Sequence, residues 1–197
     1  MKIYHHRRNK QAELEETPIS LGVEIDLRSW GRELILEHDP CVRGETLVDW
    51  IRAYRHSGLI LNVKEEGLEG QLLEMMSEQN ITDFFFLDQS YPFMVKWLKA
   101  GLGRHIAARV SEYESIESLE SLPSLPSYIW CDSFTGDWSH LPTVVQYALE
   151  SEASIVIVSP ELQARNPENE VNYIKAMLGN VSSGQLGVCT KTPGLWQ

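Results

Sequence analysis

The sequence lacks several features that would place it in a familiar class of protein. No run of about 18 consecutive apolar residues occurs, so we expect no membrane-spanning helix and no integral association with a membrane. The charged start, MKIYHHRRNK, is not followed by an apolar segment and does not read as a signal peptide. Repeats of about 20–50 residues and low-complexity tracts are also missing, which argues against solenoids and disordered arrays.

Cysteine and basic residues are scarce. The three cysteines, Cys41, Cys131 and Cys189, lie far apart and form no CxxC pair, which argues against a disulfide framework or a zinc knuckle and favours a reducing cytoplasm. Only 17 Lys and Arg residues face 28 Asp and Glu residues, giving a formal net charge of −11. Such a surface repels nucleic acid, so we expect no nucleic-acid partner, and a phosphorylated ligand has to be held at a focused site.

What the chain does contain is a regular alternation of strand-like and helix-like segments. Its 197 residues and its apolar fraction of 43% suit one globular domain, predicted over residues 1–197. The predicted strands are short apolar runs at 2–5, 23–27, 34–37, 59–63, 84–87, 105–110, 128–131, 155–158 and 186–189. Segments with helical spacing lie between several of them, at 46–54, 68–76, 92–99, 141–149 and 171–178.

This alternation predicts βαβ units around a parallel sheet. Eight units result if 23–27 and 34–37 form a hairpin with Trp30-Gly31 at its turn, and eight units indicate a (β/α)8 TIM-type barrel. The chain is near the lower size limit for that fold, so we expect a compact barrel with shortened or missing helices: residues 11–16 form barely two turns, and nothing helical is expected after Cys189. An open sheet of five or six strands is the alternative.

Glu24 and Asp26 are the most informative polar residues. Residues i and i+2 of a strand point to the same face, so both carboxylates point one way and Val23, Ile25 and Leu27 the other. Two carboxylates facing a barrel interior repel each other unless a cation lies between them, and a hard divalent ion, Mg²⁺ or Ca²⁺, would bind such oxygens. The alternative is the exposed face of an edge strand, where both side chains simply meet water.

Two stretches of the sequence together resemble a known family. Residues 22–28, GVEIDLR, and residues 33–40, ELILEHDP, resemble the G-x-E-x-D-V and V-x-H-D motifs of the glycerophosphodiester phosphodiesterases, whose barrel superfamily includes the phosphatidylinositol-specific phospholipases C. His6-Arg7 resembles the start of that family's His-Arg-Gly motif. Asn62-Val63-Lys64 stands where the family has Glu-x-Lys.

The resemblance implies a role for each matching residue. His6 and His38 would be catalytic, Glu24 and Asp26 would bind the metal, and Arg7 and Lys64 would bind the phosphate. Asn62 stands at the place of the third metal ligand, and Asp88 of the next predicted strand is the candidate to substitute for it. One histidine would take a proton from the nucleophile and the other would protonate the leaving group, while Mg²⁺ or Ca²⁺ polarises the phosphoryl group. The implied activity is metal-dependent hydrolysis of a small phosphodiester, either glycerophosphodiester-like or a sugar-phosphate diester. Whether water or a hydroxyl of the substrate attacks is left open.

The sequence leaves two alternatives open. Arg8 replaces a glycine and Asn62 replaces a carboxylate, which would suit a non-catalytic phosphate-binding barrel descended from such enzymes. A barrel isomerase or lyase acting on a sugar phosphate is the other alternative, with Arg109 and Asp132 as possible substrate contacts. Ser111, which lies two residues after Arg109, is expected only to cap the helix that follows it. The stretch between Asp39 and Leu59 is too short for the insertion seen in many members of the family, so the family's usual substrate is not assumed.

Overall fold

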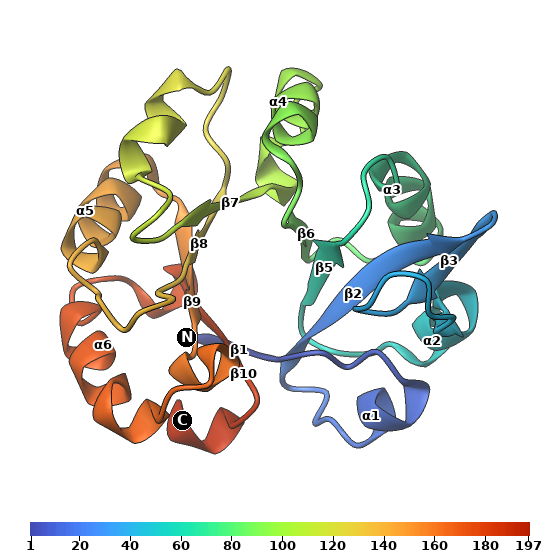
Figure 1. The fold of residues 1–197 in the computed structure, drawn as a ribbon, viewed down its shortest axis with the longest axis horizontal. Coiled ribbons are helices and arrows are strands. Elements are labelled where there is room, and N and C mark those ends of the chain that lie inside the picture. The colour runs from blue at the N-terminus through green and yellow to red at the C-terminus, as the bar shows by residue number, and fades with distance from the viewer. The chain divides into compact units, whose positions relative to one another are not determined.

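The computed structural model describes residues 1–197 and divides the chain into two compact units. The N-terminal unit is Tyr4–Met94, and the C-terminal unit is Val95–Gln197 together with Met1–Ile3. Both units alternate strands with helices (Figure 1). The longest α-helix has 11 residues, and none of the helices has the length and apolarity that a membrane span requires.

The N-terminal unit is built on a mostly parallel sheet. Its elements are β1 (Lys2–His5, of which Tyr4 and His5 belong to this unit), α1 (Gln11–Glu15), β2 (Gly22–Trp30), β3 (Glu33–Leu36), β4 (Glu45–Thr46), α2 (Leu47–Ala53), β5 (Leu59–Val63), α3 (Glu69–Glu78) and β6 (Phe84–Leu87). Strand β2 pairs in parallel with β1 and β5, and β5 pairs in parallel with β6. Strand β3 pairs antiparallel with both β2 and β4.

The predicted hairpin is confirmed, although its first strand is longer than expected. Pairing of β2 with β5 ends at Leu27, but pairing with β3 continues to Trp30, so β2 leaves the sheet as part of a two-stranded ribbon (Figure 1). Gly31 has a φ of +67° at the first position of the two-residue turn, as type II′ turns require. The hairpin brings residues 37–40, which follow β3, back beside the end of β5, where Arg28 of β2 donates to the carbonyls of both His38 and Lys64.

Strands of the N-terminal unit are covered on both faces. All residues of β5 and β6 are buried, as are the first six of β2. Val23, Ile25 and Leu27 are completely buried, and each such side chain contributes about 1.5–3 kcal/mol by leaving water. The rigidity of this packing fixes the directions in which the polar side chains of β2 point.

The C-terminal unit continues the parallel pattern. Its elements are β7 (Ala107–Val110), β8 (Tyr128–Cys131), α5 (Leu141–Ser151), β9 (Ser154–Val158), α6 (Val171–Met177) and β10 (Leu186–Thr190), preceded by α4 (Tyr91–Lys99), which spans the boundary between the units. Strands β7, β8, β9 and β10 pair in parallel in that order. Helix α5 packs against β8 and β9 (Figure 1).

The helices are short, as predicted, but three local predictions are wrong. The strand predicted at 105–110 begins only at Ala107, because His105 ends a 3₁₀ turn. A 3₁₀ turn at Pro193–Leu195 follows Cys189, where nothing helical was expected. Ser111 caps no helix: its hydroxyl accepts from the N–H of Tyr113 at 3.2 Å inside a tight turn, and the next helical segment, a 3₁₀ helix, starts only at Ile116.

Candidate active site

Glu24 and Asp26 lie side by side in the interior of the N-terminal unit. Their exposed fractions are 1% and 0%, and β2 has neighbouring strands on both sides, so the edge-strand alternative is wrong. Asp26 is directly opposite Asn62 of β5 in the strand register, which places a third polar side chain on the same face. Two buried carboxylates at this spacing require compensation by cations or hydrogen-bond donors.

Glu24 receives its donors from two different segments. Its Oε1 accepts from Asn62 Nδ2 at 2.8 Å, and its Oε2 accepts from the backbone N–H of Arg7 at 2.7 Å. His6 Nε2 lies 3.8 Å from the same Oε2 atom. Burial, and after it the negative charge of Asp26, raises the pKa of Glu24 to about 7, although the hydrogen bonds from Asn62 and Arg7 act in the opposite direction.

Asp26 is held by a residue that sequence reasoning missed. Asn9 Nδ2 donates to Asp26 Oδ2 at 2.9 Å, and Asn9 Oδ1 accepts from the Asp26 backbone N–H at 2.9 Å. Arg7 Nε is 3.0 Å from Asp26 Oδ2, and Lys64 Nζ is 3.6 Å from Oδ1. Only the proximity of Asn9 to the His-Arg motif could have drawn attention to it, since its contact depends on how the intervening loop turns.

That loop turns sharply after β1. Arg7 has a φ of +56°, in the left-handed region that non-glycine residues rarely adopt. The backbone N–H of Arg8 donates to the Glu24 carbonyl at 2.8 Å, and the Arg8 guanidinium donates to the His6 carbonyl at 3.2 and 3.3 Å. Buried Trp50 adds a bond from its Nε1 to the Arg8 carbonyl at 2.9 Å. Surrounding structure thus holds the strained residue and directs Arg7 toward the carboxylates of β2.

Lys64 and Asp88 come from the ends of neighbouring strands β5 and β6. Lys64 Nζ is 3.2 Å from Asp88 Oδ2, so the ammonium lies between Asp88 and Asp26. The Lys64 side chain is 18% exposed. Asp88 itself has a φ of +60°, which local hydrogen-bonding residues such as Asp tolerate better than most.

His38 lies at the outer margin of this group. Its side chain is 41% exposed, and Nδ1 is 2.8 Å from Asp39 Oδ1. Arg28, for which no role was predicted, donates from its Nε and Nη2 atoms to the His38 carbonyl at 3.0 and 2.9 Å. The hydrogen bond from His38, together with the charges of Arg7 and Arg28, lowers the pKa of Asp39. His38 makes no hydrogen bond or ion pair with Glu24 or Asp26.

Arg109 and Asp132 belong to the C-terminal unit and pair there with each other. Asp132 also accepts from Gln163 Nε2 at 3.0 Å, and the Arg109 guanidinium lies 5.8 Å from the ring of Phe134. Each charge therefore has a partner inside its own unit. The other eight residues predicted for the site all lie in the N-terminal unit.

The donor set does not fit a divalent ion in this arrangement. No three His, Cys, Asp or Glu side chains come together in a way that could hold a metal. Asp26 Oδ1 and Asn62 Oδ1 are buried oxygens without a hydrogen-bond partner, the kind of hard ligand that Mg²⁺ and Ca²⁺ prefer. The other oxygens of Glu24 and Asp26, however, already accept from Asn62, Asn9 and the loop after β1.

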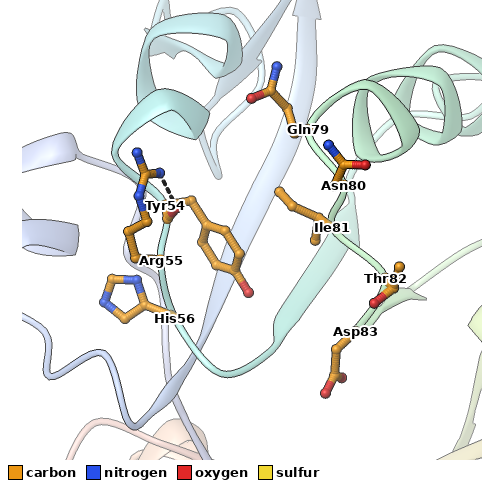
Figure 2. Close-up of a pocket in the computed structure, with 8 residues that line it drawn as sticks. All are labelled: Tyr54, Arg55, His56, Gln79, Asn80, Ile81, Thr82 and Asp83. Carbon is orange, nitrogen blue, oxygen red and sulfur yellow. Dashed lines mark hydrogen bonds between the residues drawn. The ribbon is translucent and has the colours of Figure 1, made fainter.

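A pocket of about 530 Å³ opens at the other end of the same strands (Figure 2). Its lining residues precede β5 and β6, whereas catalytic groups of barrel enzymes collect where the strands end. Arg55 Nη1 donates to the Arg52 carbonyl at 2.9 Å, and His56 Nε2 is bonded to the Thr17 carbonyl at 2.9 Å. Burial raises the pKa of the Tyr54 hydroxyl. Arg55 and His56 thus bond to backbone carbonyls, at the strand ends opposite Lys64 and Asp88.

Comparisons with known proteins connect this geometry to a fold. No family model matches the chain, and no curated protein matches it. Among solved structures, glycerophosphodiester phosphodiesterase from Agrobacterium tumefaciens superposes with a TM-score of 0.66 and 13% identity, covering 99% of this chain and 98% of that one. A putative glycerophosphodiester phosphodiesterase from Galdieria sulphuraria has a TM-score of 0.69 and 16% identity, and the superposition covers 99% of this chain and 96% of that one. For a glycerophosphoryl diester phosphodiesterase from Parabacteroides distasonis the TM-score is 0.65 and the identity 15%, with 95% of this chain and 82% of that one covered.

The fold is that of the glycerophosphodiester phosphodiesterases. The resemblance drawn from residues 22–40 is thereby confirmed at the level of structure, and so is the compact TIM-type barrel class. The open-sheet alternative is wrong. At 13–16% identity the likeness shows the fold alone, so the chemistry has to be argued from the side chains.

Proposed function

We propose that the chain binds and hydrolyses a small phosphodiester, either glycerophosphodiester-like or a sugar-phosphate diester, where β1, β2 and β5 end. One observation carries this proposal: His6, Arg7 and Lys64, which come from two separate strand ends, converge on the buried Glu24 and Asp26 pair. Proteins of the same fold named as phosphodiesterases support the substrate class.

Arg7 and Lys64 would hold the phosphate. A guanidinium has five N–H donors and an ammonium has three, so each retains donors after its contact with Asp26. Their side chains are 41% and 18% exposed, which lets a ligand reach them. Asp26 orients both cations, and Asn9 in turn orients Asp26.

His6 and His38 would move the protons. Each lies beside a carboxylate, Glu24 or Asp39, at 3.8 and 2.8 Å, which can orient the ring. One takes a proton as the nucleophile bonds to phosphorus, and the other protonates the oxygen that leaves. Product analysis decides between the two nucleophiles, since water gives a phosphomonoester and a substrate hydroxyl gives a cyclic phosphate. The Mg²⁺ or Ca²⁺ predicted from the sequence is assigned no step here, because the donor set does not fit a divalent ion.

The test is turnover of glycerophosphocholine, which has both an alkoxide leaving group that needs a proton and a neighbouring hydroxyl, by protein freed of divalent ions, then assayed with EDTA, Mg²⁺ or Ca²⁺. His6→Ala and His38→Ala should each lower kcat by about 100-fold or more. His56→Ala, a histidine of the same unit bonded only to a backbone carbonyl, is the matched control and should retain activity. Equal activity of wild type and His38→Ala would contradict the proposal.

Phosphate binding without turnover is the second candidate function. The observation that favours it is the Asn62 amide, which donates to Glu24 where the resemblance leads us to expect a carboxylate. Calorimetric titration with a phosphodiester then gives clear affinity while no condition yields product. The isomerase or lyase alternative loses its motive, because Arg109 and Asp132 serve as each other's partner.

A further inference from the structure

The place expected to hold a metal already contains cations of the protein. Lys64 Nζ lies 3.6 Å from Asp26 Oδ1 and 3.2 Å from Asp88 Oδ2, bridging two of the carboxylates that the sequence assigns to a metal. Arg7 Nε lies 3.0 Å from the other oxygen of Asp26. A flexible ammonium with three donors is able to bridge two carboxylates in this way.

Asn62 reduces the attraction for a divalent ion further. A neutral amide removes one negative charge relative to a carboxylate at this position, and the affinity of calcium sites depends on the number of charged ligands. Its Nδ2 also uses Glu24 Oε1 as an acceptor at 2.8 Å. A metal ion would have to displace both this amide and the bridging ammonium.

We propose that Lys64 and Arg7 are the resident cations of this site in place of a divalent metal. The protein then keeps its carboxylates in position in metal-free solution and gains no stability from millimolar Mg²⁺ or Ca²⁺. The inference rests on the proposed function for the purpose of the site, but its test uses no turnover.

The cost of displacing Lys64 supports the assignment. A bound divalent ion and the ammonium would repel each other at these distances, so Lys64 would have to move into solvent and lose both carboxylate partners. Because the ammonium is tethered to β5, it also occupies the site at a high effective concentration.

The experiment measures Tm of the full chain, treated with EDTA and dialysed, against MgCl₂ or CaCl₂ with NaCl of equal ionic strength as control. Wild type and Lys64→Arg should shift by less than about 1 °C. Lys64→Met leaves Asp26 and Asp88 without their shared cation, so its Tm should fall and Ca²⁺ should raise it by about 4 °C. The double variant Lys64→Met/Asp88→Asn lacks one of the carboxylates and should respond less than the single variant.

Two outcomes overturn the inference. One is stabilisation of wild type by several degrees with either metal beyond the salt control. The other is the absence of a metal response in both Lys64→Met and Asn62→Asp, the latter adding a carboxylate while keeping the lysine. Metal stabilisation of wild type would leave the proposed phosphodiesterase function intact, whereas lack of turnover under every condition would remove that function without touching the assignment of Lys64.

Discussion

Glu24 of the N-terminal unit and two glutamates of the C-terminal unit, Glu112 and Glu161, have pKa values shifted in opposite directions. In the C-terminal unit, burial alone would raise the pKa of Glu112, but hydrogen bonds from the Thr135 hydroxyl and from backbone N–H groups lower it to about 2. Bonds from Ser159 and Thr190 likewise lower the pKa of Glu161 against the effect of burial. In the N-terminal unit, burial and a neighbouring carboxylate raise the pKa of Glu24 to about 7.

The difference separates structural carboxylates from candidate functional ones. Glu112 accepts at both oxygens from the turn at Phe134 and Thr135, so it stabilises that turn and needs no ligand. Glu24 and Asp26 share a buried strand face with two cations whose donors are only partly used. The pKa is shifted at both Glu112 and Glu24. A binding site is indicated at Glu24 because its pKa is raised and because Arg7 and Lys64 beside it keep N–H donors for a ligand.

The largest effect is expected from Asp26→Ala. This change removes the partner of Arg7, Asn9 and Lys64 in the interior, so the free energy of unfolding should fall by about 3 kcal/mol or more, as when one member of a buried ion pair is removed. Urea unfolding measures it, and a single transition is expected if residues 1–197 form the one domain that the sequence predicts. Asp49→Ala, at an exposed carboxylate paired with Arg52, is the control, and an equal loss in both variants would contradict the special position of Asp26.

The position of the β2 carboxylates could be predicted from sequence, but the contacts around them could not. Glu24-Ile25-Asp26 alternates in register with completely buried apolar residues, and a strand period of two then fixes the shared face. Asn9 reaches Asp26 because the chain turns at Arg7, which has a positive φ. Two hydrogen bonds hold this turn, from the Arg8 N–H to the Glu24 carbonyl of β2 and from Trp50 to the Arg8 carbonyl. Non-local contacts of this kind leave no periodic signal in the sequence.

Ionic partners were equally hidden. Arg109 and Asp132 had no evident role in the sequence, because they are 23 residues apart and meet only through the parallel pairing of β7 with β8. Strand order was predictable from the alternation of segments, but which charged ends meet depends on the exact register and on side-chain rotamers.

The next effect in size concerns pH and Glu24. The pKa of Glu24 is about 7 in the folded protein and 4.5 ordinarily. Between pH 4.5 and pH 7 the folded protein therefore keeps a proton that the unfolded chain has released. The stability that this proton contributes is complete below pH 4.5 and is lost as the pH rises through 7. Glu24→Gln abolishes this dependence. Between pH 5 and pH 8 in EDTA, the unfolding free energy of wild type should therefore fall relative to that of the variant by about 1–3 kcal/mol.

Urea unfolding at several pH values measures this difference, with the exposed Glu33→Gln as control. A difference that stays constant between pH 5 and pH 8 would show that Glu24 titrates normally, and the contrast with the C-terminal carboxylates would then disappear.

Arg109→Ala should affect stability and leave function alone. Asp132 is 1% exposed and would lose its charged partner while keeping Gln163 as a donor, so we expect a loss of about 2 kcal/mol in unfolding free energy. Phosphodiester affinity measured by calorimetry should stay within about twofold of wild type. Arg43→Ala, at an exposed pair with Glu33, should change neither quantity. Loss of affinity at unchanged stability would instead restore Arg109 as a substrate contact.

The smallest effect is expected from Thr135→Val, which tests the structural half of the comparison. Valine keeps the shape but removes the hydroxyl that donates to Glu112 at 2.6 Å, so the pKa of Glu112 should rise from about 2 toward its ordinary value of 4.5. A lowered folded-state pKa contributes stability above pH 4.5, and this stability is lost as the pH falls through 2. The variant should therefore be less stable than wild type by about 1 kcal/mol at pH 7, and the two should have equal stability near pH 2 if both remain folded there.

NMR titration of the Glu112 carboxyl measures the pKa directly, also in the case in which acid unfolds the protein. Thr143→Val, at an exposed position of α5, controls for the substitution itself. An unchanged pKa in Thr135→Val would mean that backbone N–H groups alone hold Glu112 ionised, and the turn would then owe its stability to the main chain and not to the hydroxyl.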